Sequence, residues 1–409
     1  MNLKSNLYFK NKESNLLVLL FVFSLIIRIP VIFIFGDTEL ENEWGILVNN
    51  LTEHGKLSMK NFGNVFVPNV FMPPLYAFYL FIFKFFHLSK DLYIHVVLIS
   101  QCLISSFAVI IFYLINKIFF SKKLSLLGAL LFSLLPIHVY ACAQISSIIL
   151  QTFLTILFFY FYLKLIEKNN LYYIFLLSIS AGLLILLRGE FIALFILSIL
   201  YLIIINKLNL KKSFLIILLT LIVISPYLTR NIFILDSVTI TKSIGYNLWK
   251  GNNTKADVEG FSSYSYYSSL KEKIDGVPKD KYYEINLDKV FLHAGISSIL
   301  ENPKGFFILY CKKFLSFVII NINSTYPNYY NPLHYLPVLV LSLLSIAGIV
   351  MSDRNSYQMN FLILFFLSNV AIVSFFFILP RYKLGIIPLQ IIFSNILLEY
   401  IVNKFFTKK

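Results

Sequence analysis

Four carboxylates stand within seven residues directly after the first long apolar run of the chain: Asp37, Glu39, Glu41 and Glu43. Like charges held close together at a low-dielectric surface either shift their pKa values or bind a cation. A carboxylate in such a place can remove a proton from a reacting group. Glu43 is the first candidate for a general base, because Trp44 beside it can hold it at a membrane interface. Asp37 and Glu41 are the alternatives, and a solvated acidic surface is the competing interpretation.

Basic side chains at the ends of apolar runs form a second set of candidates. Arg381 and Lys383 flank Tyr382 near the last apolar run, and Arg230 stands where another run ends. Guanidinium groups bind phosphate through two hydrogen bonds, and an ammonium group adds a point charge. The same residue types also anchor helices at a membrane interface, so both roles stay open. Arg28, in the outer half of the first run, is placed to pair with the acids.

The segment 245–253 has the composition of a sugar-binding loop. Asn247 and Asn252 offer amide donors and acceptors, and Trp249 offers a face for a sugar ring. A tight turn anchored by an interfacial tryptophan is the competing interpretation. No HExxH, Walker, GxSxG or Cys/His metal spacing occurs in the sequence. The sequence therefore requires no cofactor, although the acids of the first loop are suited to a divalent cation.

The composition shows which elements must position these residues. The chain has 409 residues, of which 58% are hydrophobic and 13% charged, and its mean hydropathy is +0.78. A membrane span needs about 20 apolar residues, and the chain offers many such runs. The net charge of +15 comes mostly from short loops and the termini, as orientation by positive loops requires, and not from a nucleic-acid surface.

The sequence therefore predicts an all-α polytopic membrane protein with about 10–12 transmembrane helices and two outer-face loops. The segments 75–88 and 305–323 contain Lys84 and the pair Lys312 and Lys313, so we expect them to lie at the interface instead of crossing. Both termini are then cytoplasmic. The expected parts are 1–35 (tail and first helix), 36–74 (acidic outer loop), 75–230 (bundle), 231–333 (long outer loop) and 334–409 (last helices).

The order of these motifs resembles the GT-C class of membrane glycosyltransferases, in particular bacterial relatives of dolichyl-phosphate-mannose protein mannosyltransferases and of the lipid A aminoarabinose transferase. The resemblance runs along nearly the whole chain, and three substitutions depart from the family pattern: Gly189, Tyr227 and Lys383 stand where Pro, Trp and Arg are usual. The motifs that carry it are Glu43-Trp44-Gly45, Phe71-Met72-Pro73-Pro74, Arg188-Gly189-Glu190, Pro226 to Asn231, Gly245 to Asn252, and Arg381-Tyr382-Lys383.

The resemblance implies an inverting transfer of a sugar from a polyprenyl-phosphate donor to a glycan, lipid or protein acceptor. It implies a multi-pass plasma-membrane protein whose site lies on the periplasmic or extracellular face. The implied catalytic residues are Glu43, Asp37 and Glu41; the donor-phosphate residues are Arg381, Lys383, Arg230 and Arg28; and the sugar or acceptor residues are Tyr246, Asn247, Trp249, Asn252, Arg188 and Glu190.

Two other functions compete with this interpretation. A polysaccharide polymerase or ligase would use a lipid-diphosphate glycan, but the residues that matter in its outer loop tend to be Arg and His, not acids. A transporter or flippase usually shows internal repeats and ionisable residues at mid-membrane. Here no repeat is visible and the polar segments share one face, which argues against transport.

Overall fold

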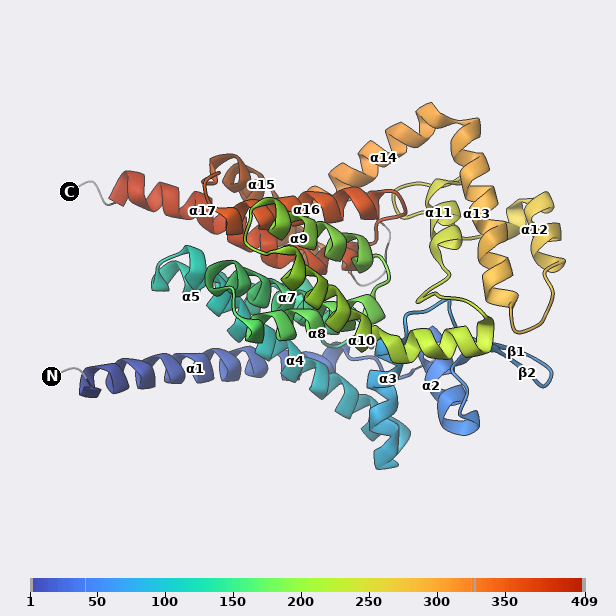
Figure 1. Ribbon diagram of the computed structural model, residues 1–409, viewed down its shortest axis with the longest axis horizontal. Coiled ribbons are helices and arrows are strands. Elements are labelled where there is room, and N and C mark those ends of the chain that lie inside the picture. The colour runs from blue at the N-terminus through green and yellow to red at the C-terminus, as the bar shows by residue number, and fades with distance from the viewer. Residues whose placement is uncertain (1–2, 41, 322, 325, 327–328, 407–409) are drawn as a thin grey trace.

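Helices make up nearly all of the molecule, as the sequence predicts. The computed structural model describes residues 3–40, 42–321, 323–324, 326 and 329–406 (Figure 1). In this part of the chain the sheet consists of one antiparallel hairpin, β1 (Ser58–Phe62) and β2 (Val65–Pro68). The expected all-α polytopic class is therefore confirmed.

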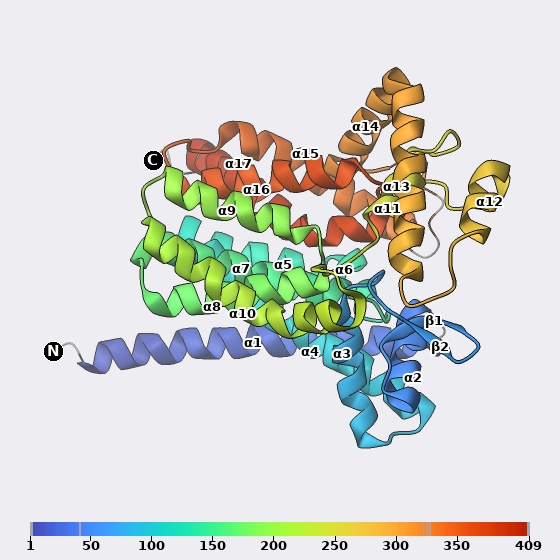
Figure 2. The ribbon, with the colours of Figure 1, turned by 45° about the vertical axis from the view of Figure 1, so that its right-hand side comes forward.

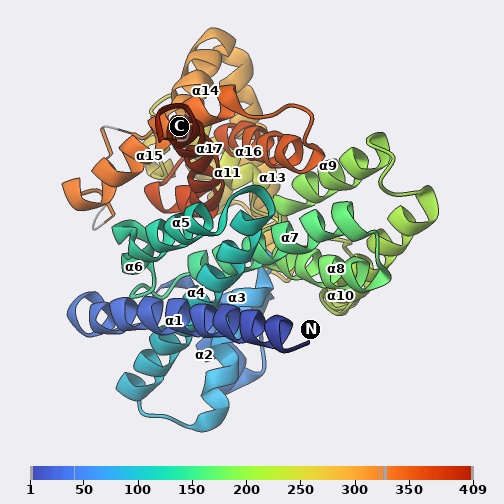
Figure 3. The ribbon, with the colours of Figure 1, turned by 90° about the vertical axis from the view of Figure 1, so that its left-hand side faces the viewer.

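A bundle of roughly aligned helices forms the larger part of the fold (Figure 2). Its members are α1 (Leu3–Phe35), α4 (Lys90–Phe119), α5 (Lys122–Leu134), α6 (Pro136–Ala141), α7 (Ile148–Lys168), α8 (Leu171–Leu187), α9 (Phe191–Ile204), α10 (Leu210–Leu235), α15 (Pro332–Met351), α16 (Tyr357–Ser374) and α17 (Ile387–Phe406). In Figures 2 and 3, α1 lies on one side of the bundle and α15 to α17 lie on the other, with α4 to α8 between them.

The smaller part of the fold sits at one end of this bundle, and we call it the cap. It contains α2 (Glu43–His54), β1, β2, α11 (Ile244–Asn252), the 3-10 turn η2 (Tyr264–Tyr266), α12 (Ser268–Asp275) and α13 (Tyr283–Glu301). Helix α1 begins and α17 ends at the opposite end of the bundle (Figure 1). The two polar segments of the sequence, far apart along the chain, therefore meet in one place.

Six helices in the described part of the chain are long and apolar enough to cross a membrane, namely α1, α4, α7, α10, α15 and α16. Apolar helices of 10–17 residues include α8 and α9. The core between α7 and α16 is aromatic, with Tyr162 and Phe361 stacked at 3.6 Å between ring centres. These spans support the multi-pass arrangement, and the number of crossings beyond the six stays a prediction.

Three short elements lie at the junction of bundle and cap. They are α3 (Pro74–Ile82) with η1 (Phe83–Phe86), α14 (Pro303–Val318), and the turn η3 (Pro380–Gly385). Helix α3 lies across the bundle direction in Figure 2. Ile82 at its end, and Phe85 and Phe86 of η1, are exposed. Exposed apolar side chains at this level are compatible with the interfacial position expected for 75–88, which remains a prediction.

Local sequence explains why α2 stands where it does. Asn42 caps its first turn, with Oδ1 accepting the backbone N–H of Trp44 at 3.1 Å and of Gly45 at 3.3 Å. Gly55 ends the helix with φ of +63°, a left-handed conformation that glycine adopts without strain. The helix is thus fixed at both ends, and Glu43, its first residue, faces the rest of the cap.

Candidate active site

Asp37 is anchored between the end of α1 and the turn that precedes α7. Its backbone N–H donates to the carbonyl of Ala143 at 2.9 Å, and its Oδ2 accepts the N–H of Ile145 at 2.6 Å. The side chain is half-buried. Burial raises the pKa of this carboxyl, and the hydrogen bond from Ile145 acts in the opposite direction. The carboxylate of Asp37 is therefore fixed in position, with one oxygen hydrogen-bonded to the backbone.

A network of amides fixes the turn on which Asp37 rests. Gln101 in α4 donates to the carbonyls of Cys142 at 3.2 Å and Gln144 at 2.9 Å, and accepts the hydroxyl of Tyr76 at 2.8 Å. Gln144 in turn donates to the carbonyl of Phe35 at 3.1 Å. These bonds tie α4, the turn and the end of α1 together, so the position of Asp37 is set by the bundle itself.

The other acids of the first loop are spread over different surroundings. Glu39 forms an exposed ion pair with Lys90 at 3.3 Å. Glu41 lies outside the described residues. Glu43 is exposed at the start of α2 and acts electrostatically on Tyr246 and Lys250 of α11. The described carboxylates therefore do not form one cluster, because each meets a different neighbour.

Helix α11 presents Tyr246 and Lys250 on the same face, one turn apart. Burial and the guanidinium of Arg381 lower the pKa of Lys250, and the carboxylate of Glu43 acts in the opposite direction. The ammonium also lies 4.0 Å from the centre of the Phe377 ring. Lys250 was not among the residues that the sequence singles out; its spacing from Tyr246 is the signal that would have found it.

Two arginines from distant parts of the chain converge on one tyrosine. The guanidinium carbon of Arg188 lies 5.5 Å from the centre of the Tyr382 ring, and that of Arg381 lies 5.9 Å from it. Arg188 is held by Gln151, whose Oε1 accepts its Nε–H at 2.8 Å. Arg381 also lies 5.5 Å from the ring of Tyr326. Among the described residues neither arginine has an ion-pair partner, so both keep charge available for an anion.

Tyr329 connects this arginine pair to the first loop. Burial raises the pKa of Tyr329, Asp37 acts in the same direction, and Arg381 acts in the opposite one. Its buried hydroxyl has no hydrogen-bond partner in the described part of the chain. Asp37 and Arg381 are therefore within electrostatic reach of the same hydroxyl, and Glu43 and Arg381 within reach of Lys250. Together these five residues link the cap to the bundle.

The remaining candidates from the long loop are placed differently. Trp249 is 1% exposed and packs against Phe291, so its ring offers no face to a sugar. Asn252 donates to the carbonyls of Leu248 and Phe375, both at 2.8 Å. Its Oδ1 accepts from Lys313, so its amide is used within the fold. Both residues build the cap.

Two further candidates lie near Arg188 or on α11. Asn247 is half-exposed on α11, next to Tyr246. Glu190 is exposed two residues after Arg188 and acts electrostatically on Tyr382. These positions are compatible with contact to a sugar or an acceptor.

Arg28 is buried inside the bundle, away from the first-loop acids. Its Nε–H donates to Ser105 at 2.8 Å, and one terminal nitrogen donates to the hydroxyl of Ser24 at 2.6 Å and the carbonyl of Ser133 at 3.1 Å. The other terminal nitrogen lies 3.3 Å from Nδ1 of His138. The guanidinium thus joins α1, α4, α5 and α6.

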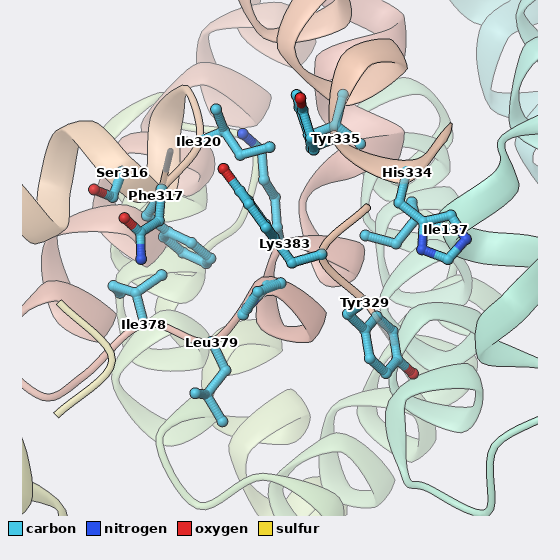
Figure 4. Close-up of a pocket in the computed structure, with 14 residues that line it drawn as sticks. Ile137, Ser316, Phe317, Ile320, Tyr329, His334, Tyr335, Ile378, Leu379 and Lys383 are labelled. Carbon is cyan, nitrogen blue, oxygen red and sulfur yellow. The ribbon is translucent and has the colours of Figure 1, made fainter. Parts of the chain in front are cut away.

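The ammonium of Lys383 is also fully used in hydrogen bonds within the fold. Its ammonium donates to the carbonyls of Val318 at 3.0 Å and Ile319, and to the hydroxyl of Ser342 at 2.8 Å. Figure 4 shows it at a small cavity of about 30 Å³, with Tyr329 and His334 on the far side. A cavity of that size accommodates about one water molecule and no sugar. Lys383 therefore ties η3 to α14 and α15.

A much larger cavity of about 800 Å³ opens between α2, α3, α8 and α10. Among the described residues that line it, Arg230 and Lys56 are charged and none is acidic. Arg230 donates to the carbonyls of Asn69 at 3.0 Å and Leu57 at 3.3 Å, which fixes the guanidinium at the rim. The apolar wall consists of Leu51, Leu57, Val65, Phe66, Leu75, Phe78, Leu186, Val223 and Ile234. An apolar cavity with cations at its edge suits a lipid with an anionic head group.

A metal site built from protein side chains is not formed by the described residues. No group of three or more His, Cys, Asp or Glu side chains in this part of the chain is close enough to hold an ion. The separation of Glu39 from Asp37 and Glu43 explains why the acid-rich stretch does not gather around one point.

Part of this architecture matches a known family. Residues 72–229 match the family model for dolichyl-phosphate-mannose-protein mannosyltransferase. The matched segment runs from the start of α3 into α10, and so includes Arg188 and part of the lining of the large cavity. A comparison with curated protein sequences finds no match.

The whole fold is similar to solved structures of GT-C enzymes. The oligosaccharyltransferase AglB from Archaeoglobus fulgidus, in complex with an inhibitory peptide and a dolichol-phosphate, matches with a TM-score of 0.55 and 14% identity, over 96% of this chain and 51% of that chain. The apo form of the Archaeoglobus fulgidus enzyme matches equally well, with a TM-score of 0.55 and 14% identity over 95% of this chain and 51% of that one. This chain therefore spans about half of their length.

A weaker likeness is to ArnT from Cupriavidus metallidurans bound to undecaprenyl phosphate, with a TM-score of 0.47 and 11% identity over 95% of this chain and 79% of that chain. The chain thus shares its fold with the AglB structures, and the resemblance to GT-C proteins that the motifs predict is confirmed.

Proposed function

We propose that the protein is a glycosyltransferase that moves a sugar from a polyprenyl-phosphate carrier to an acceptor hydroxyl at the cap end of the bundle. The observation that carries the proposal is the convergence of Arg188 and Arg381 on Tyr382. Arg381 also acts electrostatically on Tyr329 together with Asp37, and on Lys250 together with Glu43. A phosphate group gains negative charge as its bond to the sugar breaks. Guanidinium groups with no carboxylate partner among the described residues are suited to stabilise that charge.

The reaction follows from this arrangement. Asp37 removes the proton of the acceptor hydroxyl, and the oxygen forms a bond to the anomeric carbon of the donor sugar. The bond from that carbon to the phosphate oxygen breaks on the opposite face, and the polyprenyl phosphate leaves with the electron pair, so the configuration is inverted. Arg188 and Arg381 neutralise the leaving group.

Asp37 takes the role of base in this proposal ahead of Glu43, which the sequence alone ranks first. The pKa of Asp37 is raised by burial, and its position is fixed by the N–H of Ile145, and both properties favour a general base. Glu43 is exposed and faces Lys250 and Tyr246. In this proposal Glu43 and α11 contact the acceptor, which is a glycan, lipid or protein hydroxyl.

The donor lipid occupies the large cavity between α3, α8 and α10. Phe78 and Ile234 on its rim are 41% and 38% exposed, so the cavity opens where apolar side chains face the lipid. Arg230 attracts the anionic head group to the rim, and Leu186 in the wall stands two residues before Arg188. The dolichol-phosphate bound in the AglB structure supports a carrier of this class.

The reaction takes place at the outer face of the plasma membrane, with both termini cytoplasmic. The distribution of lysines supports this orientation, because lysines flank or occupy the turns that follow α4, α7 and α9, and these turns belong to the same end of the bundle as the start of α1. Positive loops remain in the cytoplasm during insertion. The cap then faces the outside.

The experiment is a transfer assay with the full chain in lipid nanodiscs. A panel of undecaprenyl-phosphate-linked hexoses and pentoses is supplied together with surface glycan, and release of undecaprenyl phosphate is measured by mass spectrometry. We expect release with at least one donor, and its loss in Asp37→Asn and Arg381→Ala. Glu53→Gln, an exposed acid at the far end of α2, is the matched control and should retain release.

The outcomes separate the competing functions. Consumption of a lipid-diphosphate glycan, and of no monophosphate donor, would identify a polymerase or ligase. In liposomes of the same lipid composition, movement of the lipid-linked sugar between leaflets without any release of undecaprenyl phosphate would identify a flippase. The proposal names no required cofactor; comparing release in EDTA with release in Mg²⁺ or Mn²⁺ tests whether the first-loop acids recruit a divalent cation.

A further inference from the structure

Helix α13 runs beside α11 and extends toward the hairpin (Figures 1 and 2). It carries two buried carboxylates one turn apart, Glu284 at 4% exposure and Asp288 at 9%. Residues four apart on a helix share one face. A buried carboxylate is costly unless it accepts hydrogen bonds, so the partners of these two groups indicate what they are for.

Glu284 binds the segment that joins the hairpin to α3. Its Oε2 accepts the backbone N–H of Val70 at 2.7 Å and of Phe71 at 2.8 Å. Lys60 and Arg230 are close enough to act electrostatically on the same carboxylate. Hydrogen bonds to a charged acceptor are stronger than those between neutral groups, and here one oxygen holds two successive peptide groups.

Asp288 binds the start of α11. Its Oδ1 accepts the backbone N–H of Tyr246 at 3.1 Å, and the N–H of Gly245 also contributes. The first N–H groups of a helix have no partner within the helix, so a carboxylate from α13 caps α11. A side chain at Gly245 would overlap the backbone oxygen of Asp288, so the close approach of the two helices depends on glycine.

The two segments held by α13 also touch each other. The rings of Phe71 and Tyr246 lie 5.5 Å apart, and the N–H of Lys242 donates to the carbonyl of Val70 at 2.6 Å. One segment leads into α3, whose Tyr76 packs against Trp44 at 5.0 Å beside Glu43. The other carries Lys250. The two sides of the candidate active site are thus joined through α13.

We propose that Glu284 and Asp288 are positioning residues, which clamp the 70–71 segment and α11 to α13 and thereby fix where α11 places Tyr246 and Lys250. This inference rests on the proposed function for its catalytic consequence, but the clamp itself is independent of any activity. Neither carboxylate contacts the arginine pair, whose members lie on the end of α8 and on η3.

Hydrogen–deuterium exchange on the full chain in nanodiscs tests the clamp. The variants are Glu284→Ala and Asp288→Ala, the conservative pair Glu284→Gln and Asp288→Asn, and the control Glu301→Gln, an exposed acid at the end of α13. We expect Glu284→Ala to speed exchange in peptides covering 66–74, and Asp288→Ala in those covering 244–252. The change should be about tenfold or more, as loss of hydrogen bonds to a charged acceptor implies.

Exchange in α7, remote from the clamp, should stay unchanged, and the amide variants should show smaller effects because their oxygen still accepts. Equal exchange in wild type and Ala variants would overturn the inference. If the Ala variants exchange faster than wild type in α7 as well, they are misfolded and the amide variants decide the test. The amide variants must then still show faster exchange in the clamped peptides than Glu301→Gln does.

Transfer kinetics provide the functional readout. We expect Asp288→Asn to lower kcat about tenfold, with KM for the donor within about twofold, because no arginine of the proposed donor site is among the groups that act on Asp288. A rise in donor KM at unchanged kcat would contradict a positioning role. If wild-type protein transfers no sugar, the proposed function fails, whereas the exchange measurement still decides whether the clamp exists.

Discussion

The guanidinium of Arg188, at the end of α8, lies 5.5 Å from the centre of the Tyr382 ring, in the turn before α17. Arg381 lies 5.9 Å from the centre of the same ring. A guanidinium near an aromatic ring is held in orientation while its N–H groups stay free for an anion. In the proposed function, the tyrosine keeps these two like charges close together for the phosphate of the donor.

Removal of either arginine tests this arrangement. We expect Arg188→Ala and Arg381→Ala each to reduce kcat/KM by about 10²-fold, the usual effect of deleting one group that stabilises transition-state charge. Arg381→Lys should retain part of the activity. Arg354→Ala is the control, because Arg354 stands in the loop between α15 and α16 and donates to the carbonyl of Ile349. Equal losses in Arg354→Ala and Arg381→Ala would contradict a phosphate role.

The pH dependence of transfer should report Asp37. A general base must be ionised, so kcat/KM rises with pH as Asp37 loses its proton. Because burial raises the pKa of this carboxyl, the acidic limb should lie above the range of an ordinary aspartate, about 3.9. Asp37→Asn should abolish the limb and reduce the rate by about 10²–10⁴-fold. A retained limb in Asp37→Asn that disappears in Glu43→Gln would transfer the role to Glu43.

The raised pKa of Asp37 also affects stability, which should fall with rising pH whereas the activity rises. A carboxyl whose pKa is higher in the folded than in the unfolded protein favours folding when protonated, and that contribution is lost as the pH rises above the unfolded value. Asp37→Asn cannot ionise, and its amide oxygen can still accept from Ile145. Its Tm at neutral pH should therefore equal or exceed that of wild type, which separates loss of activity from loss of fold.

Lys383 should matter for stability and not for donor binding. Lys383→Met removes three hydrogen bonds, although Gln390 still donates to the carbonyl of Val318 and the hydroxyl of Ser342, and Ser342 still donates to the carbonyl of Ile319. The cost is then about 0.5–1.5 kcal/mol for each lost bond. We expect a clearly lower Tm in detergent, with an unchanged donor KM for the protein that remains folded. Lys312→Met, at an exposed position on α14, is the control. A raised KM at unchanged Tm would restore a phosphate role for Lys383.

The sequence predicts the class of the fold because that class depends on composition and on the order of motifs. Long apolar runs, basic short loops and two polar segments suffice to indicate a polytopic protein with its chemistry at one end. The particular partners depend on contacts between residues far apart in the chain. Asp37, Glu39 and Glu43 look alike along the sequence, yet Ile145, Lys90 and the face of α11 give them different surroundings.

Burial explains why the predicted sugar-binding residues of the long loop are placed differently in the structure. Trp249 and Asn252 have the composition of a sugar site, but α13 and α14 pack over α11 and use both side chains. Lys250, between them in sequence, places its ammonium 4.0 Å from the centre of the Phe377 ring, within electrostatic reach of Glu43 and Arg381. Which residue of a short helix faces a site depends on how the helix is rotated. That rotation is set here by Asp288, 42 residues from Tyr246.

Close helix packing in the bundle can be tested at one glycine. A side chain at Gly348 of α15 would overlap the backbone oxygen of Phe393 in α17. Small residues allow membrane helices to approach in this way. We expect Gly348→Ala to destabilise the protein by about 1–3 kcal/mol, as overpacking does, and to lower Tm in detergent. Gly276→Ala meets its nearest atom at 3.4 Å and should be nearly neutral; similar losses in both would refute the packing argument.

The large cavity makes the effect of chain length measurable. Leu75→Trp and Leu186→Trp each place a larger ring in the wall of the cavity of about 800 Å³. Because the proposed occupant is the isoprenoid chain, we expect KM for an undecaprenyl-phosphate donor to rise about tenfold, the cost of losing one or two buried methylene groups. A two-isoprene analogue, too short to fill the cavity, should show little change, and kcat should be unchanged for both donors. Leu200→Trp is the matched control, because Leu200 of α9 is 50% exposed. An equal rise in KM for the long and short donors would mean that the substitutions disturb the phosphate site, and that the chain lies outside this cavity.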